Sequence, residues 1–496
     1  AGMDDVRAAC AEVTPESVAE ITGIGADVIR RLARELAAAP SAAVYGRIGT
    51  TTTEFGTTTS WLIDVVNILT GNLDRPGGVM FTRPVLGGPT TRGQSGRGSG
   101  FSIGRGGGRT VVRGYPEVMG EYPAAALAEE ITDAGEAAMR ALVTVAGNPV
   151  LSTPNSEQLE QALEQLEFMV SVDMYLNETT RHADVILPPP SQLQRSHYDV
   201  ALYQFAVRSV ANYSEAVLPL DEGQPDEWEI LARLGLLAAG AGPDADPAVA
   251  DDLMARGLLQ HAVADPASAV HGRDVDELLD QLEPRRGPER LLDVMLQTGP
   301  FGAGFGAQPG GASLDLLLDN PHGIDFGPLE PRLPDVLRTP SGMIELDHPV
   351  LMADLGRLAS AVPGLERREM VLVGRRHLRS NNSWMHNVRV LVKGRPRCTL
   401  QVHPDDAARL GLRDGGSARV ASRVGALVAP VEVTDAIRPG VVSLPHGWGH
   451  GGRGTAMRVA AEHAGVNSNV LADDQALDPL SGTSVLNGIP VDVGPA

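Results

Sequence analysis

The 496-residue sequence is poor in cysteine and in aromatic residues. Its two cysteines, Cys10 and Cys398, are too few for a four-thiolate iron–sulfur cluster or a typical structural zinc site. We therefore predict no metal site built by this chain's own side chains, and we interpret both cysteines as unpaired thiols in a reducing compartment. Aromatic residues make up 4% of the chain, whereas 57 glycines and 36 prolines indicate many turns between Ala/Val/Leu cores, as in α/β proteins.

Positive charge and long apolar runs are also scarce. The formal net charge is −21, and an acidic surface repels phosphate backbones, which argues against nucleic acid as a partner. No apolar run reaches the roughly 18 residues of a membrane span, so no span is predicted. The first ten residues, AGMDDVRAAC, have neither the basic start nor the apolar stretch of a secretory signal. These features predict a cytoplasmic protein.

The apolar patterns predict α/β domains followed by a β domain. Short apolar runs alternate with helices in the first half, which indicates parallel sheets covered by helices. The strands predicted there are 42–46, 141–146, 168–172 and 185–187, and the helices are 26–38, 60–69, 155–165, 226–239 and one that begins at Thr14-Pro15. Later, short β runs with Gly/Pro turns and one small helix, 403–411, indicate a closed, barrel-like β domain. These runs are 370–373, 398–402, 418–421, 427–433 and 441–444.

The segment 87–109 is a long loop with ten glycines and four arginines. A loop of this length within a compact protein is either functional or disordered. Its guanidinium groups attract oxyanions, so it could line a funnel for an anionic substrate. A solvated, flexible loop is the equally weighted alternative.

Gly147, Asn148 and Pro149 follow a predicted strand directly, in the run VAGNP. Nucleotides bind at the carboxyl ends of strands in open α/β sheets, and a glycine there lets the backbone approach a phosphate or ribose. A plain β-turn is the alternative. Asp173 and the run NETT, 177–180, follow the next strand, before a returning strand that begins at Ala183. Turn and capping roles, or a strand-edge role for Asp184, are the alternatives for these polar residues.

Three polar runs mark the last domain. The run RHLRSNNSWMHN, 376–387, is too rich in hydrogen-bond donors for a buried strand and suits a loop around a polyanionic ligand. Arg376 and Arg379 could clamp phosphate bidentately, although a solvated polar loop is the alternative. The runs HGWGHG, 446–451, and VNSNVL, 466–471, follow. The spacing of His446 and His450 could suggest a metal, but no third ligand is evident and the glycines between them indicate close backbone approach.

In this order the motifs resemble the molybdopterin oxidoreductase family, of the dimethyl sulfoxide reductase or formate dehydrogenase-like kind. The string NILTGNLDRPGG, 67–78, and the string TPSGMIEL, 339–346, add to the resemblance, the latter with Met343 where the family usually has Lys. The resemblance covers the C-terminal two-thirds of such a protein. It implies a remainder of an α/β domain over 1–110, an α/β pterin-dinucleotide-binding domain over 111–240, a mixed connecting region over 241–365 and a molybdopterin-dinucleotide-binding, barrel-like domain over 366–496.

The resemblance also implies the cofactor and the reaction. The family holds molybdenum or tungsten between two molybdopterin guanine dinucleotides and transfers an oxygen atom or hydride equivalents, with two electrons, on small substrates such as formate, nitrate, and S- or N-oxides. An electron-transfer partner subunit is a further expectation. Asp173 could accept hydrogen bonds from the N–H groups of guanine. The implied cofactor-binding residues are Gly147, Asn148, Pro149, Asp173, Thr179, Asp184, Arg376, His377, Arg379, Asn381, Asn382, Trp384, His386, His446, Trp448, Asn467 and Asn469.

Two family features are not recognisable in the sequence. Members usually begin with a cysteine-rich segment for a [4Fe–4S] cluster, followed by the protein ligand of the metal. We therefore expect a fragment or one part of a split enzyme, with the cluster in the missing N-terminal part, and we assign no catalytic residue. Arg83 and Arg92 do not lie in the local sequence of the arginine that faces the metal in formate dehydrogenases, so formate is not assigned as the substrate.

A non-catalytic scaffold is the competing interpretation, as in the large iron–sulfur subunit of respiratory NADH dehydrogenase, which keeps the fold without the pterins. Loss of the cofactor should erode the polar runs 376–387 and 466–471, and both are intact here. Cofactor binding is therefore the favoured interpretation.

The missing metal ligand generates a prediction for the chain alone. We expect the isolated 496-residue chain to show no turnover with formate, nitrate or sulfoxides in a dye-linked redox assay. Measurable turnover would contradict the interpretation that this portion lacks the catalytic centre.

Overall fold

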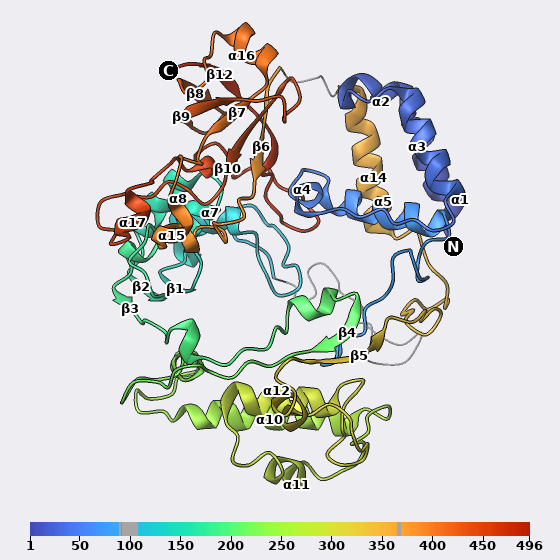
Figure 1. Ribbon diagram of the computed structural model, residues 1–496, viewed down its shortest axis with the longest axis vertical. Coiled ribbons are helices and arrows are strands. Elements are labelled where there is room, and N and C mark those ends of the chain that lie inside the picture. Colours follow the sequence, from blue (N-terminus) through green and yellow to red (C-terminus); the bar gives the residue numbers. More distant parts are fainter. Residues whose placement is uncertain (89–90, 92–107, 365–368) are drawn as a thin grey trace.

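The computed structural model describes residues 1–88, 91, 108–364 and 369–496, and these form helical, α/β and β parts (Figure 1). Most of the predicted Gly/Arg-rich loop lies outside the described residues. The helices are α1 Met3–Ala9, α2 Pro15–Thr22, α3 Ala26–Ala38, α4 Ile48–Thr51, α5 Gly56–Leu69, α6 Leu127–Thr132, α7 Pro149–Ser152, α8 Ser156–Leu163, α9 Glu227–Ala238, α10 Pro247–Ala264, α11 Val275–Asp280, α12 Gly287–Thr298, α13 Leu314–Leu318, α14 Pro349–Ala361, α15 Arg389–Val392, α16 Pro404–Leu410 and α17 Arg458–Ala461. The strands are β1 Ala141–Val145, β2 Phe168–Val172, β3 Val185–Ile186, β4 Arg208–Ala211, β5 Ile324–Pro328, β6 Val371–Arg375, β7 Leu400–Val402, β8 Ser417–Ala421, β9 Ala426–Val433, β10 Val441–Pro445, β11 Asn487–Pro490 and β12 Asp492–Pro495.

The N-terminal helices pack against a segment from much later in the chain. Val6 of α1, Val65 of α5 and Leu346, just before α14, share one buried cluster, and α14 crosses α5 in Figure 1. The predicted start of α2 is confirmed, since the Thr14 hydroxyl accepts a hydrogen bond from the Ser17 N–H and completes a capping box. The predicted left-handed glycine after α5 is also confirmed, with φ of 69° at Gly71.

The strand predicted over 42–46 is wrong. Its backbone forms hydrogen bonds with side chains instead of with a neighbouring strand. The Ala42 N–H donates to Oδ1 of Asn72 (3.0 Å) and the Val44 N–H donates to Oδ1 of Asn67 (2.9 Å). Both asparagines are buried, and they satisfy the backbone groups that a strand partner would otherwise bind.

The three-stranded parallel sheet confirms the predicted α/β part. The strand order is β1-β2-β3, with Val143 opposite Val170 and Val170 opposite Val185. Leu159 and Leu163 of α8 pack with Met169 of β2, so this helix covers one face of the sheet. The parallel direction places the carboxyl ends of β1 and β2 at the same edge.

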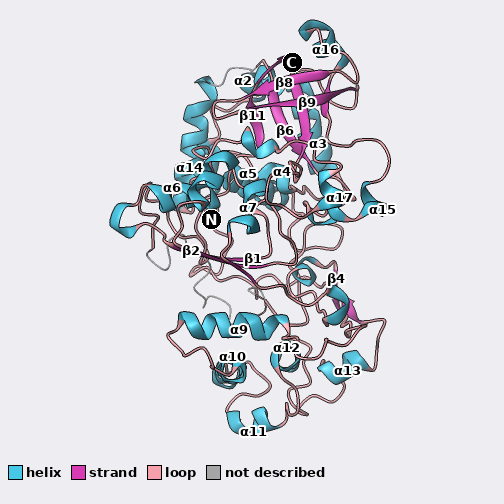
Figure 2. Cartoon of the chain, turned by 90° about the vertical axis from the view of Figure 1, so that its left-hand side faces the viewer, coloured by secondary structure: helices cyan, strands magenta, loops and turns pink. Residues whose placement is uncertain are grey.

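A helical part without a sequence motif lies beyond this sheet. Helices α10, α11 and α12 enclose one core, and α12 and α13 share a second core with Val85 and Tyr213. Strands β4 and β5 form an antiparallel pair between residues more than a hundred positions apart, which the apolar patterns did not predict. Figure 2 shows this part at the opposite end of the molecule from the seven-stranded sheet.

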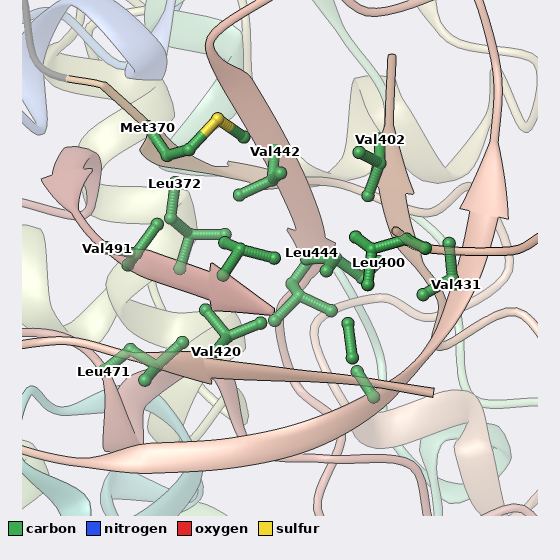
Figure 3. Close-up of a cluster of buried hydrophobic side chains, with 14 of the residues drawn as sticks. Met370, Leu372, Leu400, Val402, Val420, Val431, Val442, Leu444, Leu471 and Val491 are labelled. Carbon is green, nitrogen blue, oxygen red and sulfur yellow. The ribbon is translucent and has the colours of Figure 1, made fainter. Parts of the chain in front are cut away.

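The C-terminal part is a curled seven-stranded sheet in the order β11-β6-β10-β7-β9-β8-β12. Strands β11 and β12 occupy its two edges although Val491 alone separates them in sequence, so the sheet must curl until its edges approach. The predicted barrel-like domain is confirmed, but as a half-barrel whose described strands form no closed ring of hydrogen bonds. Leu372, Leu400 and Leu444 point into its interior (Figure 3).

Both cysteines are unpaired, as predicted. Within the described residues, no helix combines the length and apolar character needed to cross a bilayer. The four-domain division stays a prediction. Buried clusters join segments from different predicted domains, as the cluster that contains Val6 and Leu346 illustrates.

Two valines of β9 provide a matched test of the half-barrel core. Val431 is 3% exposed and Val428 is 50% exposed. We expect Val431→Ala to lower the free energy of unfolding by about 2 kcal/mol, because two buried methyl equivalents and a cavity are involved. Val428→Ala should change it by less than about 0.5 kcal/mol. Urea unfolding followed by tryptophan fluorescence measures both, and equal losses would contradict the assigned core.

Candidate functional site

A cavity of about 400 Å³ lies where the carboxyl ends of parallel strands from both sheets meet. Strand β1 ends at Val145 and leads into Gly147 and Asn148 on one wall. The parallel pair β6 and β10 ends at Arg375 and Pro445 and leads into Arg376 and His446 on the other wall. Carboxyl ends of parallel strands are the usual place for ligands in α/β proteins, and a volume of this size suits a small organic ligand.

The turn after β1 is built for close approach. Ala146 and Gly147 both have positive φ, 52° and 72°, and apart from Gly147 and its chain neighbours no residue has a heavy atom within 4 Å of the point where a Cβ on Gly147 would stand. The Asn148 side chain is held from two sides. Its Nδ2 donates to Oε2 of Glu178 (2.8 Å), and its Oδ1 accepts from the Thr179 hydroxyl (2.7 Å). The wall therefore presents an open backbone beside a fixed amide.

Asp173, after β2, lines a smaller pocket that shares Gly147, Asn148 and Trp384 with the main cavity. Its carboxylate accepts hydrogen bonds from the Tyr175 N–H (2.9 Å) and from Nδ2 of Asn177 (3.1 Å). Burial nevertheless raises the pKa of Asp173, since these bonds only partly offset the loss of hydration. A ligand with N–H donors would satisfy its remaining acceptor positions.

The opposite wall carries positive charge. Arg376, Asn382 and Trp384 of the loop after β6 line the cavity, and Asn382 has a φ of 60°. Arg375 also lines the cavity, and its guanidinium group donates to the carbonyls of Ser443 (2.7 Å) and Thr399 (2.8 Å). Among the described residues that line this cavity there is no Asp or Glu, although the chain as a whole carries a formal charge of −21. The cavity therefore suits an anion such as a phosphate.

His446 stands at the end of β10 and also lines the cavity. Burial lowers the pKa of His446, and the positive charge of Arg376 lowers it further. A neutral imidazole there can accept or donate a hydrogen bond without repelling the neighbouring guanidinium group.

A buried hydrogen-bond chain runs behind the cavity wall. It joins the two lobes of the molecule, the α/β lobe that contains β1, β2 and β3 and the lobe formed by the half-barrel. His450 Nδ1 lies 3.2 Å from Oε1 of Glu178, and His450 Nε2 lies 2.9 Å from Nδ1 of His386. His386 Nε2 lies 2.8 Å from Oγ of Ser380, and the His386 ring stacks on Trp448 with 3.9 Å between ring centroids. All five of these side chains are buried. His450 is thus part of a carboxylate–imidazole chain.

Two asparagines of the run 466–471 join the lobes. Asn467 Nδ2 donates to the Val150 carbonyl (3.0 Å), and Asn469 Nδ2 donates to the Leu151 carbonyl (2.7 Å). These carbonyls belong to α7, which begins at the cavity wall. Both asparagines therefore support the wall from behind.

The residues implied by the resemblance fall into three groups in the structure. Those that line the cavity or its side pocket are Gly147, Asn148, Asp173, Arg376, Asn382, Trp384 and His446. Those that lie behind its walls are Thr179, His386, Trp448, Asn467 and Asn469. Those that do not line either space are Pro149, Asp184, His377, Arg379 and Asn381. Asp184 lies at the amino end of β3, where its carboxylate accepts from the Met169 N–H (2.8 Å).

Several lining residues carried no signal in the sequence. Ile48, Gly49 and Thr52 come from α4 and its end, and Leu486 and Asn487 come from the start of β11. Asn487 Nδ2 donates to the Thr52 hydroxyl (2.6 Å), so segments 435 positions apart in sequence meet here. Glu178, Ser380 and His450 were also missed as a unit, although each lies in a polar run. A carboxylate and histidines in separate polar runs are the signal that could have indicated them.

Two family models match the chain. The model described as molybdopterin oxidoreductase matches residues 11–235, and the model described as molydopterin dinucleotide binding domain matches residues 370–490. The chain belongs to the molybdopterin oxidoreductase family. The cavity lies between the two matched regions and has walls from both.

Curated relatives and a solved structure agree with this family. The chain is 26% identical to a nitrate reductase of Symbiobacterium thermophilum over 85% of its length, and 26% identical to the F420-dependent formate dehydrogenase 2 subunit alpha of Methanococcus maripaludis over 89%. It spans 53% and 59% of those proteins. Acetylene hydratase from Pelobacter acetylenicus shares the fold, with a TM-score of 0.66 and 17% identity over the whole chain and 66% of that protein.

The residues present fit the family's cofactor, a molybdopterin guanine dinucleotide. The open backbone at Gly147 and the guanidinium group of Arg376 suit phosphate. The carboxylate of Asp173 is an acceptor that suits the N–H groups of guanine. For the metal, the described residues contain no group of three or more His, Cys, Asp or Glu side chains that could hold an ion.

The electrostatic coupling across the cavity wall can be measured. We expect Arg376→Gln to raise the pKa of His446, because it removes the positive charge that disfavours the imidazolium. Arg379→Gln should instead raise the pKa of His377 and leave His446 unchanged. An NMR titration of the ¹⁵N-histidine-labelled chain separates the two. An unchanged pKa of His446 in Arg376→Gln would show that the two side chains do not share this wall.

Proposed function

We propose that this chain is the cofactor-binding portion of a molybdopterin-dependent oxidoreductase that carries out two-electron oxygen-atom or hydride-equivalent transfer on a small substrate. The observation that carries the proposal is the cavity between the two lobes, which combines an open glycine backbone, arginine and a lining free of described carboxylates. Such a wall attracts the phosphates of a dinucleotide and presents no carboxylate that would repel them.

Each group of side chains has a role in this proposal. When bound, the molybdenum–pterin group supplies the two-electron chemistry. Arg376 binds phosphate, and Gly147 lets the cofactor approach the end of β1. Asp173 accepts hydrogen bonds from guanine, while Trp384 contributes a flat apolar surface at the junction of the two pockets. The other residues implied by the resemblance support these from behind or lie outside the cavity.

The substrate and the partner are proposed at the level of class. Relatives of this chain are named nitrate reductase, formate dehydrogenase, and dimethyl sulfoxide/trimethylamine N-oxide reductase. We infer a substrate from the formate, nitrate, or S- and N-oxide class. Three relatives are named as alpha subunits, which supports an electron-transfer partner subunit. A cytoplasmic location also remains a proposal.

Cofactor extraction tests the proposal. The chain is purified from a host that makes molybdopterin guanine dinucleotide, then acid-extracted and oxidised. We expect pterin fluorescence and GMP in equal molar amounts. Arg376→Gln should weaken cofactor affinity by roughly 10- to 100-fold, the loss of about 1.5–3 kcal/mol that a hydrogen bond to a charged group contributes.

Arg395→Gln is the matched control, because Arg395 is exposed in the same lobe and lines a different cavity. It should retain the cofactor content of the unmodified chain. A chain that carries neither pterin nor GMP would overturn the proposal and favour the non-catalytic scaffold.

A further inference from the structure

A second cavity, of about 340 Å³, lies within the half-barrel lobe. Its lining residues fall between Val392 and Val466, so the α/β lobe contributes no wall, and none of them lines the cofactor cavity or its side pocket. Arg395 and Pro396 are lining residues that are also exposed, so the cavity opens to solvent. Its volume suits a small organic ligand.

Two arginines give this second cavity a positive charge. Arg397 is held in place by backbone carbonyls, since its Nη1 donates to Leu391 (2.6 Å) and its Nη2 donates to Lys393 (3.2 Å). Arg395 lines the cavity beside it, and no described carboxylate forms an ion pair with either arginine. Guanidinium groups without a carboxylate partner attract an oxyanion.

The carboxylate that could cancel this charge is already engaged. Among the described residues that line the second cavity, Glu462 is the single acidic one. Arg389, which does not line the cavity, binds both of its oxygens, with Nη1 at 3.0 Å and Nη2 at 3.1 Å. The charges of Arg395 and Arg397 are therefore left for a ligand.

Most of the remaining lining is apolar. Apart from Cys398 and His463, it consists of short aliphatic side chains, two prolines and one indole ring. These residues are Val392, Pro396, Pro430, Trp448, Ala464, Gly465 and Val466. An apolar lining with a few polar groups is typical of sites for small organic molecules, in which the polar groups fix the orientation of the ligand.

The tryptophan side of the wall is tightly packed. Gly465 has a φ of 64°, and a Cβ at this position would lie 2.8 Å from Cβ of Cys398 and 3.0 Å from Cβ of Trp448. The Trp448 ring also stacks on His386, with 3.9 Å between the ring centroids. Its Nε1 is a buried donor for which the described residues provide no acceptor, an unfavourable arrangement. This wall is thus preformed and favours a ligand that carries an acceptor group.

We propose that the second cavity is a binding site for a small organic anion, with a carboxylate or similar oxyanion on a single-ring apolar body. Arg395 and Arg397 bind the oxyanion, and the valines, the prolines and Trp448 contact the body. Because no lining residue is shared with the cofactor cavity, this binding does not require a bound pterin.

Benzoate is the probe for this site, and the indole N–H signals of the ¹⁵N-tryptophan-labelled 496-residue chain are the readout. Trp448 lines the second cavity, whereas Trp384 lines the cofactor cavity, so the two signals separate the two places. Trp448→Phe identifies the Trp448 signal. We expect benzoate to shift it saturably, with a dissociation constant of about 10 mM or less.

Two further probes separate charge from apolar contact. Benzyl alcohol keeps the ring without the charge, and inorganic phosphate keeps the charge without the ring. Each should bind at least about 5-fold more weakly than benzoate, because each lacks one of the two contributions.

Arginine variants test the assigned oxyanion contacts. Arg397→Gln should weaken benzoate binding by roughly 10-fold or more, and Arg395→Gln by about 2- to 5-fold, because Arg395 is exposed. Arg419→Gln is the matched control, since Arg419 is an exposed arginine of β8 that lines neither cavity. It should keep the affinity of the unmodified chain. If Arg397→Gln does not fold, the exposed pair Arg395→Gln and Arg419→Gln still decides.

Four results would overturn the proposal. These are an unshifted Trp448 signal, a benzoate shift confined to Trp384, phosphate that binds as tightly as benzoate, and equal losses in Arg395→Gln and Arg419→Gln. The proposed function fails separately. A chain without pterin or GMP would contradict that function and leave the shift of Trp448 by benzoate as expected.

Discussion

The structure depends on the contact between the α/β lobe and the half-barrel. The α/β lobe presents carbonyls of α7 that need partners, and the half-barrel supplies them. Asn467 and Asn469 satisfy carbonyls of the short helix α7, whose last carbonyls have no partner within the helix. Leaving a buried carbonyl unpaired costs about 1–3 kcal/mol, so these amides strongly favour one docking geometry. The cavity exists because that geometry brings the carboxyl ends of β1, β6 and β10 together.

The same contact explains the charge of the cavity. A chain with a net charge of −21 repels anions over most of its surface, yet Arg376 faces a wall without described carboxylates. Carboxylates near the cavity are instead engaged behind or beside it, Glu178 by His450 and Asn148, and Asp173 by Tyr175 and Asn177. One arrangement of side chains therefore both provides hydrogen-bond partners for the buried carboxylates and leaves the cavity suited to an anion.

The sequence predicts features that depend on near neighbours. The strand 168–172, the helix 26–38 and the left-handed Gly71 agree with the structure because apolar periodicity and glycine chemistry act over a few residues. The strand predicted over 42–46 is wrong because two distant asparagines take the place of a strand partner. The pair β4 and β5 was missed since its register depends on residues far apart in sequence.

The site also combines residues that local sequence patterns predict with residues that only tertiary contacts bring together. Gly147, Asn148, Arg376 and His446 could be placed from motifs, because each lies at a strand end that the apolar pattern reveals. The contributions of Thr52 and Asn487, and the joining of Glu178 to His450, arise from tertiary contacts that no local pattern encodes.

The central claim is that the cavity between the lobes holds the nucleotide of the cofactor. Hydrogen–deuterium exchange of the chain, with and without bound molybdopterin guanine dinucleotide, tests it most directly. The account predicts slower exchange in peptides that cover 145–152, 374–387 and 446–450, with little change in the helical part over 247–318. Protection confined to other segments, or no protection at all, would contradict it.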